Sequence, residues 1–251
     1  MTPDPLRRKL AAEVMMSAGF QCKKFYVAHD QCAMKVGTDG LLLGAFAPLP
    51  APGSTMLDIG AGSGLVSLML AQRSQGLSPI DAIELDPAAA CQAAANVAAS
   101  PWPQAVQLIK GDILTYQPGK RYRLIVSNPP FFQQSLLSKD ARRSQARHTS
   151  SLPLPKLLQK AAELLDEKGV FGLVLPLSEG EMLLQQALHA GWYLAQRCEV
   201  KSKADKPVQR LLLTLRRTPC QALLSQLIIH QEDGNYSDEY RTLLKDFYLK
   251  F

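Results

Sequence analysis

From residue 55 onward, hydrophobic residues fall into short apolar runs separated by stretches whose apolar positions recur at helical spacing. The runs are rich in residues that favour strands. Predicted strands cover 55–59, 79–84, 105–109, 124–127 and 170–175, and predicted helices cover 65–73, 87–99, 154–166 and 178–190. Strands that alternate with helices in this way are typical of α/β proteins, so we expect a mostly parallel sheet with helices on both faces.

The C-terminal part of the chain predicts a different connection. Two β-like runs, 193–201 and 208–216, lie close together and favour an antiparallel hairpin that completes a seven-stranded sheet. In the last segment, Ser237 precedes two acidic residues, as is usual where a helix begins. This predicts a terminal helix over 237–249 with Ser237 as its N-cap.

The first 50 residues do not follow the alternation. Two short β-like pieces, 25–27 and 33–36, precede a predicted helix at 39–47, which Pro48 ends. Further prolines at positions 50 and 52 stiffen the connection to the next strand. We therefore expect an N-terminal extension, 1–52, that packs on the site, and a main domain, 53–251.

The most informative motif follows the strand at 124–127, where the chain reads Asn128-Pro129-Pro130-Phe131. Open α/β sheets bind ligands beyond the carboxyl ends of their strands. Proline fixes its own φ and restrains the residue before it, so Asn128 and Pro129 are both held before any ligand arrives. The corner suits chemistry on a flat group that bears a nitrogen atom.

A glycine-rich turn joins the first predicted strand to its helix. Asp58 ends the apolar run and Gly60, Gly62 and Gly64 follow. Glycine lets the backbone approach a ligand closely, and the helix N-terminus offers free N–H groups. The dinucleotide fingerprint G-x-G-x-x-G would need glycine where this chain has Leu65, so the turn favours a methionine-type tail over a pyrophosphate. These four residues are candidate cofactor ligands.

Carboxylates stand at the ends of the next two predicted strands. Glu84 ends the second strand, where a carboxylate can accept both hydroxyls of a ribose. Asp112 follows the third strand and can accept a hydrogen bond from an adenine amino group, although it could equally be a loop carboxylate or a cap. Asp86, before Pro87, is better explained as a helix start than as a second ribose ligand.

Composition narrows the class of protein. The chain has 251 residues, of which 47% are hydrophobic and 20% charged, as expected for a globular protein. Its net charge of +6 favours an anionic partner such as nucleic acid. Five cysteines without a Cys-x-x-Cys pair indicate reduced thiols and no common metal site. No signal peptide is recognised and no apolar run reaches about 18 residues, so we expect a cytoplasmic protein without a membrane span.

Two groups of basic residues are candidates for binding RNA phosphates. The first lies in the polar segment 138–151 and consists of Lys139, Arg142, Arg143 and Arg147. The second lies on and between the C-terminal strands and consists of Lys201, Lys203, Lys206, Arg210, Arg216 and Arg217. Either group could instead be solvated surface, and strand alternation should scatter part of the second to different faces.

Taken together, these motifs over about 55–217 resemble the class I S-adenosylmethionine-dependent methyltransferases. With Asn128-Pro129-Pro130-Phe131, the resemblance narrows to enzymes that methylate a planar exocyclic or amide nitrogen. The segments 25–30 and 35–45 extend it to the bacterial tRNA adenine-N6 methyltransferases that modify valine tRNA beside the anticodon. The resemblance implies a Rossmann-like fold, S-adenosyl-L-methionine as cofactor and tRNA as partner. Thr38 and Asp39 could then close the methionine end of the cofactor pocket or cap the following helix.

A mechanism follows for the Asn128 corner. An aromatic amino nitrogen is a weak nucleophile because its lone pair is delocalised, so the enzyme must orient it. The Asn128 side-chain oxygen and the Pro129 carbonyl would accept the amino hydrogens, and Phe131 would stack on the base. Phe132 is either a second stacking residue or part of the core. No titrating base is required.

The residues alone leave other substrates open. Guanine N2 in ribosomal RNA and the amide nitrogen of a protein glutamine can use the same corner. A non-enzymatic alternative is an RNA-binding assembly factor that retains the fold, although such a protein would not need Gly60, Glu84, Asp112 and Asn128 together. The sequence leaves the oligomeric state open.

Overall fold

A mixed sheet of eight strands runs through the described residues, 12–130 and 152–249, of the computed structural model. Its strands are β3 (Met56–Ile59), β4 (Ile80–Glu84), β5 (Val106–Lys110), β6 (Tyr122–Ser127), β7 (Leu165–Pro176), β8 (Tyr193–Lys201), β9 (Val208–Arg216) and β10 (Leu223–Ile228). The spatial order is β10-β8-β9-β7-β6-β3-β4-β5, and only β9 runs antiparallel to its neighbours. The predicted parallel sheet with a C-terminal hairpin is confirmed.

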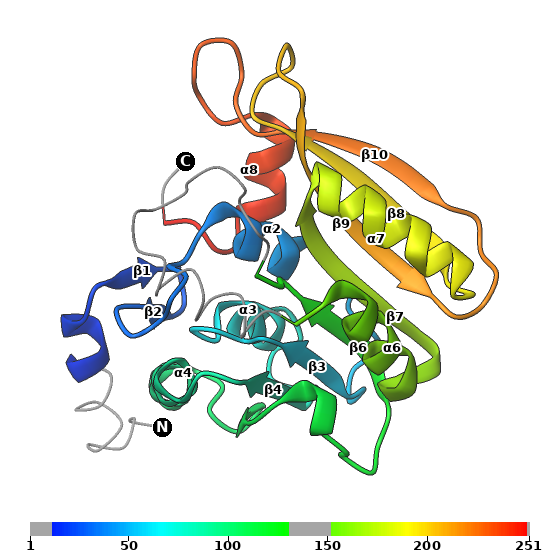
Figure 1. Cartoon of the computed structure of the whole chain (residues 1–251). Helices are drawn as coiled ribbons and strands as arrows, with labels where there is room; N and C mark the ends of the chain where they lie inside the picture. Colours follow the sequence, from blue (N-terminus) through cyan, green and yellow to red (C-terminus); the bar gives the residue numbers. More distant parts are fainter. Residues whose placement is uncertain (1–11, 131–151, 250–251) are drawn as a thin grey trace, which may run out of the picture.

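Helices cover both faces of this sheet, as predicted (Figure 1). One face carries α2 (Thr38–Phe46), α3 (Leu65–Arg73), α4 (Pro87–Ala99) and α8 (Asp238–Leu244), and the other carries α6 (Leu154–Leu164), α7 (Leu177–His189) and the short 3₁₀ helix η1 (Ile113–Thr115). The central strands are buried on both sides: Met56 of β3 packs toward α2 and α3, whereas Leu57 packs toward α6 and α7. This explains why the strands read as continuous apolar runs.

The sheet has one strand more than the seven predicted. β10 is an edge strand that pairs in parallel with β8, with Leu223 opposite Gln196 and Ile228 opposite Lys201. Leu223 and Leu224 are 64% and 72% exposed. Because the strand lies at an edge and is largely exposed, its sequence lacks the hydrophobic pattern by which the other strands were predicted.

The N-terminal segment forms a hairpin from a different pair of pieces than predicted. β1 (Gly19–Gln21) pairs antiparallel with β2 (Tyr26–Ala28), so the piece predicted at 25–27 is present. The piece predicted at 33–36 is wrong, because these residues form a bend. The Val36 N–H donates to Nδ1 of His29 at 3.1 Å, a side-chain bond that holds a turn rather than a strand ladder.

Two element boundaries also differ from the prediction. Helix α6 ends at Leu164 instead of at 166, and β7 begins at once with Leu165 instead of at 170, so Gly169 lies within the strand. A Cβ at Gly169 would lie 2.8 Å from the Tyr122 carbonyl oxygen, so this glycine permits the close approach of β6 and β7. Helix α8 is capped by Ser237, as predicted, but stops at Leu244, and the buried Phe247 follows it.

None of the described helices is long and apolar enough to cross a bilayer. The five cysteines, all within the described ranges, are free thiols. Burial raises the pKa of the Cys22 thiol to about 12, so it is protonated and packs as a small apolar side chain.

Candidate active site

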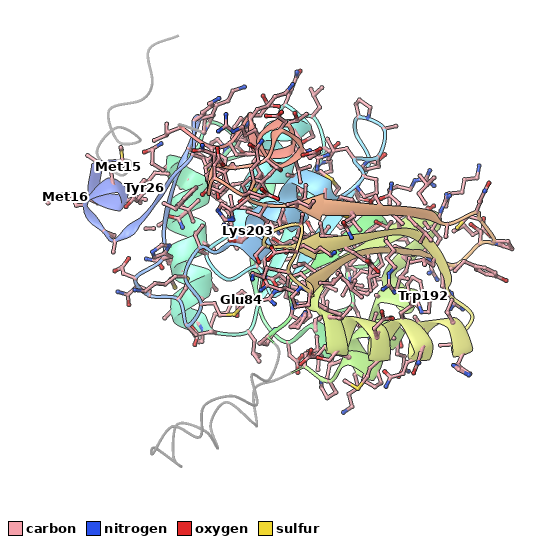
Figure 2. The ribbon with its side chains drawn as sticks, turned by 90° about the horizontal axis from the view of Figure 1, so that it is seen from above. Met15, Met16, Tyr26, Glu84, Trp192 and Lys203 are labelled. Carbon is pink, nitrogen blue, oxygen red and sulfur yellow. The ribbon has the colours of Figure 1, made fainter. Side chains whose placement is uncertain are left out.

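Gly60, Glu84, Asp112 and Asn128 lie where four neighbouring parallel strands end. β3, β4, β5 and β6 point the same way, so the loops that follow them lie along one edge of the sheet. In Figure 2, Glu84 lies in the middle of the molecule, between the N-terminal hairpin that carries Tyr26 and the C-terminal strands near Trp192. The edge is thus flanked on both sides by other parts of the chain.

The glycine turn after β3 provides an open backbone surface. Gly60 and Gly62 have φ of +73° and +54°, and a Cβ at either position would meet no atom within 4 Å. Gly64 is the N-cap of α3 and has a φ of +80°, in the left-handed region that favours glycine. Gly60 and Gly62 therefore fit a cradle for a ligand, whereas Gly64 permits the backbone turn that starts α3.

Glu84 organises this turn at the end of β4. Its Oε2 accepts from the Gly62 N–H and its Oε1 from the Asp86 N–H, both at 2.8 Å. A carboxylate has about four acceptor positions, so about two remain for the hydroxyls of a ribose. Asp86 accepts from the Ala89 N–H and caps α4, which confirms its interpretation as a helix start.

Asp112 is placed at the same edge, after β5. Its Oδ1 accepts from the Leu114 N–H at 2.9 Å and caps η1. Asp112 is therefore a cap, one of the roles that the sequence left open. A role for Asp112 toward an adenine stays a prediction.

Asp58 lies beneath the glycine turn rather than on its open side. The side chain is buried, and its Oδ2 accepts from both the N–H and the hydroxyl of Ser67, at 3.1 and 2.7 Å. The bonds join β3 to the first turn of α3. Burial raises the pKa of Asp58 to about 6, partly offset by the bonds from Ser67. These bonds fix the turn, and a role for Asp58 toward the cofactor stays a prediction.

This raised pKa predicts how stability depends on pH. Between about pH 4 and 6 the unfolded carboxyl has lost its proton while the folded one keeps it, so the folded state binds more protons and its stability falls as pH rises. We expect the difference in free energy of unfolding between wild type and Asp58→Asn to shrink by up to about 3 kcal/mol over this range and then level off. Urea unfolding at several pH values measures it. A difference that is constant from pH 4 to 7 would contradict the proposed titration.

Asn128 follows β6 at the centre of the edge, next to a buried Pro129 and an exposed Pro130. The hydroxyl of Ser127 donates to the Ile59 carbonyl at 2.9 Å and ties this corner to β3. The Oδ1 atom of Asn128 is shielded from solvent, and no donor in the described part of the chain reaches it. An unpaired buried carbonyl oxygen costs about 1–3 kcal/mol, so this atom suits an amino group supplied by a ligand.

The first turn of α2 lies against this corner. A Cβ at Gly40 would lie 4.0 Å from Nδ2 of Asn128, so α2 passes beside this amide. The N-cap of α2 is Gly37, so neither Thr38 nor Asp39 is the capping residue that the sequence left open. The Asp39 carboxylate binds Arg210 of β9 instead. A role for Thr38 and Asp39 toward the cofactor stays a prediction.

A set of buried amides that the sequence analysis missed ties the N-terminal segment to the glycine turn. The fully buried Asn96 of α4 exchanges two hydrogen bonds with the Ala28 backbone and donates to the Ser63 carbonyl. One turn earlier, Gln92 donates to Asp30 and accepts from the Gln31 N–H. Two amides four residues apart in an alanine-rich helix were the available signal, because both lie on one face.

The candidates for RNA binding have separate outcomes. The stacking candidates and the first basic group lie outside the described residues, so their roles stay predictions: Phe131, Phe132, Lys139, Arg142, Arg143 and Arg147. In the second group, Arg210 and Arg216 lie at different positions along β9: Arg216 is paired with Tyr193 at the end of the sheet remote from Asn128, whereas Arg210 is paired with Pro176 at the site end. The predicted scatter of this group to different faces stays a prediction. Lys206 forms an ion pair with Asp205, and Arg210 forms one with Asp39.

No group of three or more His, Cys, Asp or Glu side chains within residues 12–130 and 152–249 is placed to hold a metal ion. Among the described residues, this edge presents an open glycine backbone, a carboxylate with free acceptor positions and an unpaired amide oxygen. These features fit a nucleoside cofactor beside a planar nitrogen-bearing substrate.

Comparisons with known proteins agree with this geometry. The family model for the methyltransferase small domain matches residues 34–190. A tRNA1(Val) (adenine(37)-N6)-methyltransferase from Serratia proteamaculans (strain 568) is 48% identical over 234 residues, 92% of this chain and 90% of that relative.

Solved structures show the same fold at low sequence identity. One from Agrobacterium tumefaciens, described as a predicted O-methyltransferase, is 12% identical with a TM-score of 0.66 over 83% of this chain and 96% of its own. A glycopeptide N-methyltransferase complexed with S-adenosyl-L-methionine is 13% identical with a TM-score of 0.54 over 72% of this chain and 95% of its own.

Proposed function

The chain belongs to the family of tRNA1(Val) (adenine(37)-N6)-methyltransferases, and from that premise we propose that the Asn128 corner directs methyl transfer to N6 of adenine 37 in a valine tRNA. The protein is an S-adenosylmethionine-dependent tRNA methyltransferase. The observation that carries the residue-level proposal is the shielded Asn128 Oδ1 atom, which no described donor satisfies.

The cofactor fits the edge beside Asn128. Gly60 and Gly62 present open backbone on which the methionine end can lie, Glu84 has acceptor positions for the ribose hydroxyls, and Asp112 would accept from the adenine amino group. Thr38 and Asp39 would close the methionine end. When bound, S-adenosylmethionine supplies an electrophilic methyl group on a sulfonium.

Asn128 and Pro129 would orient the substrate nitrogen. The two N6 hydrogens of adenine would be donated to the Asn128 Oδ1 atom and the Pro129 carbonyl, which directs the nitrogen lone pair out of the ring plane. Because Pro129 is buried and proline restrains the residue before it, both acceptors are fixed in advance. Acceptors that are already in place stabilise the developing charge without reorganisation, and no general base is needed.

Recognition of the RNA would involve the segment after this corner. Phe131, with Phe132 as a second candidate, would stack on the extruded base, an interaction worth about 1–3 kcal/mol per base. Lys139, Arg142, Arg143 and Arg147 would bind phosphates, which makes affinity dependent on salt. We also propose that the N-terminal extension, 1–52, packs on the cofactor and substrate site. The hydrogen bonds between Asn96 and the Ala28 backbone support this proposal. A tRNA substrate implies a cytoplasmic site of action.

The experiment that tests the proposed activity uses methyl-labelled S-adenosylmethionine and bulk RNA from cells that lack this enzyme. After incubation with the purified protein, RNA fractions are digested and the nucleosides separated. We expect label in N6-methyladenosine from the tRNA fraction. Label in N2-methylguanosine, or in protein glutamine alone, would instead support the other substrates that an Asn-Pro-Pro corner can serve, and the absence of any transfer would support an RNA-binding assembly factor.

A further inference from the structure

An ion pair joins the C-terminal hairpin to α2, the helix that passes beside Asn128. Nε of Arg210, on β9, donates to both carboxylate oxygens of Asp39, on α2, at 3.0 and 3.1 Å. The two residues are 171 positions apart in the sequence. Their side chains are only 30% and 20% exposed, so salt screens this pair less than it would a surface pair.

Asp39 lies in the part of α2 that contacts the catalytic corner. The next residue, Gly40, is the one whose Cβ would lie 4.0 Å from Asn128 Nδ2 and 3.0 Å from Leu65 Cδ2. A displacement of this turn would therefore change the space around the Asn128 amide. The orientation of that amide decides where its Oδ1 atom points.

Helix α2 begins with side chains that are not buried: Thr38 is exposed and Asp39 is half-buried. Its N-cap, Gly37, makes no side-chain capping bond, as is also true of α3, α6 and α7. Farther along, α2 is fixed by close packing, since a Cβ at Gly44 would lie 2.6 Å from the Met69 sulfur. The Arg210–Asp39 pair thus secures the end of the helix that packing leaves least constrained.

We propose that Arg210 is a positioning residue for methyl transfer. It holds Asp39, and through Asp39 the first turn of α2, so that the Asn128 amide keeps its oxygen available to the substrate amino group. The inference rests on the role proposed above for Asn128. It also gives the hairpin β8–β9 a function in the reaction, because β9 supplies the guanidinium.

A direct contact between Arg210 and RNA phosphate is the competing explanation. Two observations favour the positioning role of Arg210. Its Nε already donates to the Asp39 carboxylate, and its Nη1 donates to the Gln209 carbonyl at 3.0 Å. An Asp39 carboxylate beside the guanidinium would also repel a phosphate. The two explanations predict different kinetics.

The test is a double-mutant cycle with Arg210→Gln, Asp39→Asn and the double variant, using steady-state kinetics on tRNA. We expect each single change to lower kcat about 10- to 100-fold, the scale of a misplaced reacting group. The double variant should be no slower than the slower single variant, because both changes break one interaction. The KM for tRNA and the salt dependence of tRNA binding should stay within about twofold of wild type.

Arg197→Gln is the matched control. Arg197 lies on the neighbouring strand β8, is 19% exposed and pairs with Glu181 and Glu199 rather than with α2. It should lower thermal stability about as much as Arg210→Gln while leaving kcat unchanged. Arg210→Lys keeps a positive charge that can pair with the Asp39 carboxylate, so it should retain most of kcat. This variant still tests the proposal if Arg210→Gln does not fold.

Two results would overturn the proposal. Additive losses in the double variant, or a raised KM with a salt slope shallower by about 0.7–0.9, would assign Arg210 to a phosphate contact. Equal losses of kcat in Arg197→Gln and Arg210→Gln would show a general effect on the fold. Failure of the proposed function is separate from both, since wild type would then not methylate tRNA at all.

Discussion

Replacing Asn128 with alanine is expected to lower kcat for tRNA methylation about 100- to 1,000-fold, the usual cost of removing one preorganised polar group from a transition state. The change deletes the shielded Oδ1 atom that would accept an N6 hydrogen. Affinity for S-adenosylmethionine should change less than about twofold, because the cofactor candidates Gly60, Gly62 and Glu84 lie on other loops. Single-turnover kinetics and calorimetry measure the two quantities.

Two further variants define the outcome. Asn128→Asp keeps an acceptor oxygen of the same reach and should retain more activity than Asn128→Ala. Asn235→Ala, in an exposed loop where Asn235 is bonded to Asp233, is a matched asparagine control that should behave as wild type. Full activity in Asn128→Ala would remove the proposed role of this amide.

Replacing Glu84 with alanine should raise the dissociation constant of S-adenosylmethionine about 100-fold. Hydrogen bonds to a charged group contribute about 1.5–3 kcal/mol, and the variant loses the acceptor for the ribose hydroxyls. It also leaves the N–H groups of Gly62 and Asp86 without their acceptor, which loosens the glycine turn. Isothermal calorimetry of the purified variant gives the constant directly.

The matched variant for Glu84 is glutamine. Its single amide oxygen can replace only one of the two carboxylate acceptors, so its affinity should fall between wild type and Glu84→Ala. Glu179→Ala changes a half-buried acidic residue in the first turn of α7 and should leave the affinity unchanged. An unaltered affinity in Glu84→Ala would mean that another acid holds the ribose.

Those parts of the fold that follow from local pattern could be predicted from the sequence. A strand buried on both faces is largely apolar, which is why β3, β4 and β6 were recognisable. Parallel strands place their carboxyl ends together, so the convergence of Gly60, Glu84 and Asn128 at one edge followed from the order of elements alone.

The rest depends on pairings between distant segments. Nothing near Arg210 indicates Asp39 as its partner, and nothing near Ala28 indicates Asn96. The edge strand β10 lacks the burial that marks a strand, and 33–36 resembles a strand although a His29 side chain bends it into a turn. Sequence pattern reports the local environment, whereas these features depend on tertiary contacts.

The central claim is that this edge site methylates N6 of adenine 37. The most direct measurement incubates wild-type protein and labelled S-adenosylmethionine with an unmodified valine tRNA transcript and with the same transcript carrying guanine at position 37. The account predicts N6-methyladenosine mapped to position 37 in the first transcript and no label in the second. Equal labelling of both transcripts, or label mapped to another nucleotide, would contradict it.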